Sequence, residues 1–220
     1  MKRQLEELLD TNLQKINHIS ENKHFIGFSK KLGKRVFVKI FKDPLKYRLE
    51  YKVLRNKGNF LLDFPEYSAL VLKYEEFIPL SKESVEDEDI IKIAELISDF
   101  HRGNWLSIEN DKEISLEKVL EKNVYRLADR KEYTEISELH SKFLKNISKL
   151  DEEYEKTLVL IHGDFGLRNI MRKDDNLVLI DFERVKYASY YLDFIKYFYQ
   201  DLDNDKRKIE LFLEHYYEYS

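Results

Sequence analysis

Two short apolar runs in the last third of the chain are each followed by residues that can do chemistry. The runs are Leu158–Ile161 and Leu177–Ile180, and the polar segment Arg172–Asn176 between them indicates a hairpin-type turn. The polar residues that follow the runs are His162, Asp164, Asn169 and Asp181. Short apolar runs bounded by turn signals are typical of buried strands. We therefore expect two strands that hold these side chains at one mouth, where a cation or a phosphate would bind.

The spacing of these residues favours phosphoryl transfer. Asp164 and Asn169 stand in the pattern His-x-Asp-x-x-x-x-Asn. In kinase catalytic loops, an Asp at this spacing accepts the proton of the attacking hydroxyl and the Asn binds Mg²⁺. Asp181 stands where the second metal-binding acid of that template belongs, and Mg²⁺ prefers oxygen ligands. The alternative is that these residues only form turns at strand ends, as Asp and Asn often do.

A lysine and a glutamate further upstream fit the same chemistry. Lys39 lies in the apolar segment Arg35–Phe41, which we expect to be a strand, and Glu50 lies eleven residues later in an expected helix over residues 45–56. Taken alone, Lys39 would be read as an edge or solvent-facing lysine, because lysine is rarely fully buried. Together the pair fits an arrangement in which a helix carboxylate holds a strand lysine toward nucleotide phosphates.

These motifs resemble those of the aminoglycoside phosphotransferase and choline kinase superfamily. His162–Asn169 carries the His-Gly-Asp that is usual there, and Ile180–Glu183 carries its Asp-Phe-Glu. The resemblance extends to Asp193, where the family has an acid that opens a helix behind the catalytic loop. It also extends to Leu96–His101, which is similar to a helix end of the family.

The resemblance implies an α+β, bilobal protein-kinase-like fold. Residues 1–78 would form a nucleotide-binding lobe with an antiparallel β-sheet and one main helix, and residues 79–220 a mostly helical lobe with the catalytic loop and the acceptor site. The implied site roles are these: Asp164 as catalytic base, Asn169 and Asp181 as Mg²⁺ ligands, and Lys39 on the phosphates of ATP or GTP with Glu50 as its partner. His162 is expected to be a structural residue of the loop.

One segment departs from the family pattern. The turn that covers the nucleotide is usually rich in glycine, so that backbone N–H groups can reach phosphate. Here that turn is expected near Ile19–Lys23, which contains no glycine. Ser20 and Asn22 are the candidate donors, and we expect weaker nucleotide binding or a looser lid.

The remaining pattern supplies the elements that would position these residues. A helix is expected over residues 1–15 and a hairpin over His24–Phe41 with Gly33 in its turn, followed by a strand near residues 69–74. Further helices are expected around residues 90–101, within 114–150, and over 190–199 and 206–219.

Composition limits the function classes. The chain has 220 residues, a net charge of −4, 43% hydrophobic residues and no cysteine. The charge disfavours a nucleic-acid partner, and the lack of cysteine excludes thiol chemistry and disulfides. No apolar run approaches the roughly 20 residues of a membrane span. With an amino terminus that lacks the apolar core of a signal peptide, this favours a cytoplasmic protein.

The acceptor is less defined than the reaction. Acidic and aromatic residues gather in the last thirty-five or so positions: Asp201, Asp203, Asp205, Glu210, Glu214, Glu218, Tyr187, Tyr190, Tyr191, Tyr197, Tyr216, Tyr217 and Tyr219. They could line a cleft for a cationic acceptor, such as an amino sugar or a choline-like head. They could equally face solvent or core at helical spacing. The main hypothesis is a small-molecule kinase; the alternatives are an atypical protein kinase and an inert kinase-like protein that binds a ligand or partner.

Overall fold

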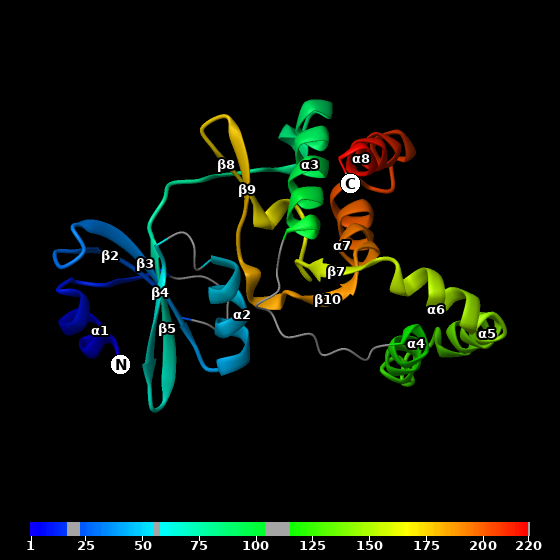
Figure 1. Cartoon of the computed structure of the whole chain (residues 1–220), viewed down its shortest axis with the longest axis horizontal. Coiled ribbons are helices and arrows are strands. Elements are labelled where there is room, and N and C mark those ends of the chain that lie inside the picture. Colours follow the sequence, from blue (N-terminus) through cyan, green and yellow to red (C-terminus); the bar gives the residue numbers. More distant parts are fainter. Residues whose placement is uncertain (17–22, 55–57, 104–114, 220) are drawn as a thin grey trace. The chain divides into compact units, whose positions relative to one another are not determined.

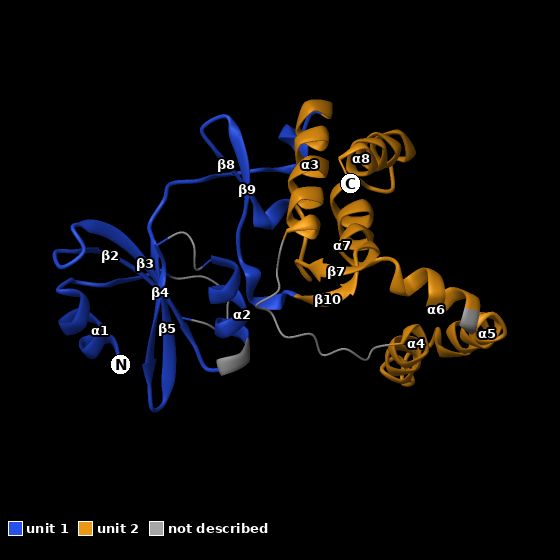
Figure 2. Ribbon diagram, in the orientation of Figure 1, with its two compact units in different colours: residues 1–86, 167–185 blue, residues 87–166, 186–220 orange. Residues whose placement is uncertain are grey.

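The computed structural model describes residues 1–16, 23–54, 58–103 and 115–219. The chain divides into two compact units (Figure 2). Unit 1 contains residues 1–86 and 167–185, and unit 2 contains residues 87–166 and 186–220. The segment 167–185 therefore packs with the amino-terminal residues, although it follows unit 2 residues in the sequence.

A five-stranded antiparallel sheet forms the main part of unit 1 (Figure 1). Its strands are β1 (Gln14–Ile16), β2 (Lys23–Ser29), β3 (Lys34–Phe41), β4 (Phe60–Phe64) and β5 (Tyr67–Lys73). The strand order is β1-β2-β3-β5-β4, so β3 lies in the centre. Gly33, at φ 61°, supplies the left-handed residue of the turn between β2 and β3, as expected from the sequence.

Helices pack on both faces of β3, which explains its nearly continuous apolar sequence. Val36, Val38 and Ile40 belong to one buried cluster with Leu5 and Leu9 of helix α1 (Lys2–Leu9). Side chains alternate between the two faces of a strand. The residues between these three therefore point to the other face, where α2 (Pro44–Leu54) contacts β3 and β5. A strand buried on both faces does not show a clear two-residue alternation.

A second, three-stranded sheet completes unit 1. It contains β6 (Ile78–Pro79), β8 (Ile170–Lys173) and β9 (Asn176–Leu179), in the order β6-β8-β9. The hairpin turn expected at residues 172–176 is confirmed, with Asp174 at φ 53° between β8 and β9. The strand before this turn is β8 (Ile170–Lys173) and not the expected run Leu158–Ile161, which pairs in another sheet. Two 3₁₀ turns flank the hairpin, η3 (Leu167–Asn169) and η4 (Phe182–Arg184), and η4 packs against α2.

Unit 2 is mainly helical. Its short strand β7 (Leu158–Ile161) pairs with β10 (Lys186–Ser189), and α3 (Asp87–Arg102) packs along α8 (Lys206–Glu218). Helix α7 (Tyr191–Lys196) continues directly into a π-helical turn, Tyr197–Asp201. An aromatic core lies around these elements; its buried members are Phe165, Phe194, Tyr197, Phe212 and Tyr216.

Three further helices of unit 2 contact one another: α4 (Leu116–Tyr125), α5 (Tyr133–Leu144) and α6 (Ile147–Glu155). The first turn of α4 is capped twice. The Ser115 hydroxyl accepts from the Lys118 N–H, and the Asp151 carboxylate accepts from the Leu116 N–H at 2.7 Å. These contacts satisfy donors that a helix start leaves unpaired. No helix among the described residues has the length and apolar character needed to cross a bilayer.

Candidate active site

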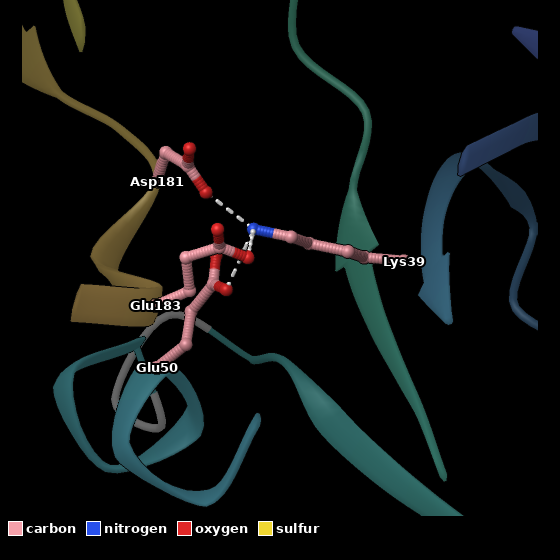
Figure 3. A network of polar contacts seen from close by, with 4 residues as sticks. All are labelled: Lys39, Glu50, Asp181 and Glu183. Carbon is pink, nitrogen blue, oxygen red and sulfur yellow. Dashed lines mark hydrogen bonds and ion pairs between the residues drawn. The ribbon is translucent and has the colours of Figure 1, made fainter. Parts of the chain in front are cut away.

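Lys39 is the centre of a buried charge cluster in unit 1 (Figure 3). It is 3% exposed, so the interpretation of a solvent-facing lysine is wrong. Its ammonium donates to Glu50 Oε2 at 2.9 Å and to Asp181 Oδ1, and it lies 3.5 Å from Glu183 Oε2. A lysine this deep is stabilised only where acceptors surround it. The three predicted residues Lys39, Glu50 and Asp181 therefore lie together, and Glu183 joins them.

Three separate segments position this cluster. Lys39 extends from the face of β3 on which α2 packs, and Glu50 comes from α2 and is 2% exposed. Asp181 has φ 65° and ψ 63°, a left-handed conformation that is uncommon outside glycine, asparagine and aspartate. This conformation ends the chain's extended course after β9 and begins η4, which carries Glu183. The packing of η4 against α2 then places the acids on one ammonium.

Burial and charge act in opposite directions on the two central groups. Burial alone would lower the pKa of Lys39, but the attraction of Glu50 and Asp181 outweighs it, so the pKa is raised and the side chain stays protonated. For Glu50, burial is the largest effect and raises the pKa to about 7, although Lys39 opposes the shift. Asp181 and Glu183 contribute to the same rise, because they are like charges nearby.

The acids of the cluster have the chemistry of a hard-cation site. Oxygens of Glu50, Asp181 and Glu183 all lie within 4.8 Å of one another. Three carboxylates around one ammonium leave an excess of negative charge, which a divalent cation would neutralise. Asn169 lies in the same unit and is buried, and its backbone carbonyl accepts from the N–H of Ile180 at 3.0 Å, one residue before Asp181. The donor set therefore fits Mg²⁺.

A cavity of about 370 Å³ in unit 1 reaches this cluster. Glu50 and Asp181 form part of its lining. Much of the rest is apolar: Leu54, Leu72, Phe77, Val178, Leu179, Ile180 and Phe182. Ligand sites commonly combine such apolar walls with a few charged groups at one end. The cavity thus combines apolar walls with charged groups, as a ligand with an apolar and a charged part would require.

Asp164 lies in unit 2, on the loop that follows β7. Its side chain is 7% exposed and accepts from the ammonium of Lys196 on α7 at 2.5 Å. This ion pair was not expected from the sequence. The available signal was the spacing of Lys196, which lies one helical turn after Asp193 and therefore on the same side of α7.

Asp193 fixes the backbone of that loop. It is 1% exposed, and its two carboxylate oxygens accept from the N–H groups of His162 and Gly163 at 2.7 and 2.8 Å. His101 of α3 contacts Asp193 through Nε2 at 3.1 Å and the Tyr216 hydroxyl through Nδ1 at 3.0 Å. Gly163 has φ 74°, which favours glycine at this position. His101, the last residue of the family-like segment Leu96–His101, is thus a contact partner of Asp193.

The other expected residues have more varied positions. Ser20 and Asn22 lie outside the described residues. Of the residues proposed for a cationic cleft, Tyr197 and Tyr216 are buried in the aromatic core. Asp205 caps α8 by accepting from the Lys208 N–H, and Glu210 and Glu214 are exposed on α8. Five of the thirteen residues therefore have a structural place or face solvent, which favours the second interpretation of that segment.

The fold is the one seen in kinases of small molecules. Residues 74–219 match the ecdysteroid kinase-like family. The chain belongs to that family, and the resemblance to the aminoglycoside phosphotransferase and choline kinase superfamily is confirmed. No curated protein matches the chain in sequence.

Solved structures of similar fold come from three kinds of enzyme. An ethanolamine kinase from Plasmodium vivax has 17% identity and a TM-score of 0.62, over 94% of this chain and 68% of that one. A choline kinase from Streptococcus pneumoniae has 18% identity and a TM-score of 0.65, over 98% and 78%. An aminoglycoside phosphotransferase from Streptomyces rimosus, in complex with ADP and streptomycin, has 17% identity and a TM-score of 0.60, over 93% and 85%. The expected protein-kinase-like fold is confirmed.

Proposed function

We propose that this protein is a kinase that transfers the γ-phosphate of ATP or GTP to a hydroxyl group of a small molecule. The observation that carries the proposal is the cluster in which Glu50 and Asp181, from distant segments, hold the buried Lys39. Membership of a kinase-like family supports it. So do related structures, since the S. pneumoniae choline kinase was solved with AMP and the S. rimosus phosphotransferase with ADP.

In the proposed reaction, unit 1 binds the nucleotide. The apolar part of its cavity takes the base, and Lys39 binds phosphate oxygens while Glu50 holds its ammonium in place. Asp181 and Asn169, with Glu183 as a further acid, would hold Mg²⁺. A bound Mg²⁺ supplies positive charge to the phosphate oxygens during transfer. Positioning and charge stabilisation account for most of the catalysis in this class of reaction.

Unit 2 supplies the proposed base. Asp164 accepts the proton of the acceptor hydroxyl as that oxygen attacks the γ-phosphorus and the bond to the β-phosphate oxygen breaks. The Lys196 ion pair orients the Asp164 carboxylate. Asp193 fixes the adjacent backbone, so the carboxylate is carried by a loop with few alternative conformations. His162 has a structural role in this proposal, because its N–H is part of the same clamp.

Two substitutions distinguish an active kinase from an inert relative. In Asp164→Asn we expect phosphate transfer to fall by about 10³-fold or more, with nucleotide affinity kept. In Asp181→Asn we expect the affinity for the Mg²⁺–nucleotide complex to fall at least tenfold. Asp175→Asn, in the exposed β8–β9 turn, is the matched control and should change neither quantity.

The measurements are ADP release with a panel of hydroxyl acceptors and calorimetric titration of ATP and GTP with Mg²⁺. The panel includes aminoglycosides, choline, ethanolamine, sugars and an ecdysteroid, since the family name points to the last of these. Unchanged turnover in Asp164→Asn would remove the base assignment. If the protein binds nucleotide but transfers phosphate to no acceptor, and Asp164→Asn leaves ADP release unchanged, the inert relative is favoured.

A further inference from the structure

A basic pocket of about 430 Å³ lies in unit 2, next to the loop that carries Asp164. Its lining includes Gly163, the residue that precedes Asp164. Four cationic residues line it: Lys118, Lys122, Arg126 and Lys186. We call it the α4 pocket, because three of these four residues belong to α4 and its C-cap.

The positions of the cations follow from the elements that carry them. Lys118, Lys122 and Arg126 are spaced four residues apart, so they lie along one side of α4. Lys186 comes from the first residue of β10. No acidic residue lines the pocket among the described residues. Within the same described part of the chain, none of these four side chains has an ion-pair partner.

These charges determine which ligand the pocket can accept. Four cations around one small volume repel an ammonium group and attract a carboxylate or a phosphate, most strongly at low ionic strength. Each exposed charge contributes little by itself, and the selectivity comes from their convergence. Val119, Ile161 and Leu192 supply apolar contacts for a carbon skeleton. The volume is in the usual range for sites that bind small molecules.

We propose that the α4 pocket binds the acceptor and selects a hydroxylated small molecule that carries a carboxylate or phosphate group. The proposal deepens, and rests on, the kinase function proposed above. It differs from the cationic acceptor expected from the acidic and aromatic carboxyl-terminal segment. The structural reason is that four cationic residues and, among the described residues, no acidic one line this pocket, whereas Glu210 and Glu214 are exposed on α8 and Asp205 caps it.

The test compares matched probes that differ in charge. The anionic probes are glycerol 3-phosphate and gluconate, the neutral ones glycerol and glucose, and the cationic ones choline and glucosamine. Binding is measured by ligand-observed NMR, which detects millimolar affinities. The charge-reversing variants are Lys118→Glu with Lys122→Glu, and separately Lys186→Glu on a different element. Lys145→Glu, an exposed residue outside the pocket, is the control, and Lys39→Met tests for anion binding at the nucleotide cluster.

We expect only the anionic probes to bind. Their Kd should rise at least tenfold in both charge-reversing variants and with added salt, and stay unchanged in Lys145→Glu and Lys39→Met. Absence of anionic probe binding to the wild type, equal binding in the reversed variants, or preference for the cationic probes would overturn the proposal.

A separate titration with ADP and Mg²⁺ distinguishes this inference from the proposed function. Affinity for ADP should be the same in the wild type and in the charge-reversing variants. Failure of the wild type to bind nucleotide would refute the kinase function. Binding of the anionic probes would then still show an anion site in the α4 pocket. Normal nucleotide binding with no charge preference among acceptors would refute only the anionic acceptor.

Discussion

At the scale of single residues, the cluster around Lys39 brings four charged side chains from three segments together. One ammonium satisfies three carboxylates, two of them largely buried. Buried charges of this kind contribute little net stability, because desolvation offsets most of their attraction. A net stabilising contribution therefore does not explain the cluster, which agrees with the binding role proposed for it.

The pKa of Glu50 leads to a prediction about pH. Folding raises this pKa to about 7 from its ordinary value of 4.5, so the folded state keeps a proton that the unfolded state releases between these values. The free energy of unfolding contributed by Glu50 therefore falls as pH rises from about 4.5 through 7. Between pH 5 and 8 the wild type should lose roughly 1–3 kcal/mol relative to Glu50→Gln. Denaturant titrations of both proteins without divalent cations measure this, and parallel pH profiles would contradict it.

Lys196 gives a second prediction at this scale. Lys196→Met should lower kcat about 10–100-fold with nucleotide Kd unchanged, because the Asp164 carboxylate loses the ion pair that orients it. Lys196→Arg should recover part of the activity. Lys206→Met, exposed at the start of α8, serves as the control. Equal kcat in Lys196→Met and the wild type would contradict the positioning role.

At the scale of elements, the loop after β7 is held by helices from distant parts of the sequence. Asp193 of α7 binds its backbone, His101 of α3 binds Asp193, and Tyr216 of α8 binds His101. Networks of buried polar groups are strong only when every member is satisfied. The three helices therefore stabilise the loop as one unit.

This chain of contacts predicts a large effect of a small change. Asp193→Asn replaces one accepting oxygen by an NH₂ group that faces donors, so we expect the free energy of unfolding to fall by about 2–4 kcal/mol. Thermal and denaturant unfolding measure the loss. Asp99→Asn, which breaks an exposed ion pair one turn before the end of α3, should cost less than about 1 kcal/mol. Comparable losses in the free energy of unfolding of the two variants would contradict the view that the buried Asp193 contacts stabilise the loop more than a surface ion pair does.

Sequence patterns predicted long elements and local pairs better than distant contacts. The Lys39–Glu50 pair followed from the spacing between a strand and the next helix, and α3 and α8 followed from helical periodicity. Strands β4, β8 and β10 were overlooked, since a run of four or five residues becomes a strand only through its pairing partner.

The end of α1 and the partners of the site residues were still harder to predict from the sequence. The helix expected over residues 1–15 ends at Leu9, because Asp10 takes a left-handed conformation with φ 45°. Leu13 nevertheless joins the same buried cluster from outside the helix. The contacts of Glu183 with Lys39 and of Lys196 with Asp164 join residues far apart in the chain. The spacing of Lys196 from Asp193 indicates only the side of α7 on which it lies, not its partner.

At the scale of the whole molecule, neither unit is built from one continuous stretch of the chain. Unit 1 begins the chain and receives residues 167–185 after unit 2 has begun. Its cavity lining combines residues from both segments, such as Leu72 and Ile180. Unit 1 is therefore complete only when the chain has been made to about residue 185.

Ligand binding should be visible in the stability of the whole protein. A ligand at about 100 times its Kd adds roughly 2.7 kcal/mol to the folded state. For a chain of this size, ADP with Mg²⁺ should then raise the unfolding midpoint by about 5–10 °C. The shift should shrink when EDTA replaces Mg²⁺. Thermal unfolding monitored by circular dichroism tests this, and equal midpoints with and without ADP would count against a nucleotide site.

The shared ammonium of Lys39 also makes the two proposed ligands of unit 1 interdependent. A phosphate that draws Lys39 away leaves Asp181 and Glu183 with uncompensated charge, and a cation on those acids releases Lys39 for the phosphate. Each ligand should therefore raise the affinity for the other by the same factor, as thermodynamic linkage requires. Titrating Mg²⁺ at fixed nucleotide, and nucleotide at fixed Mg²⁺, should give one coupling constant. In Lys39→Met that constant should move toward one, because the ammonium through which the two ligands influence each other is gone.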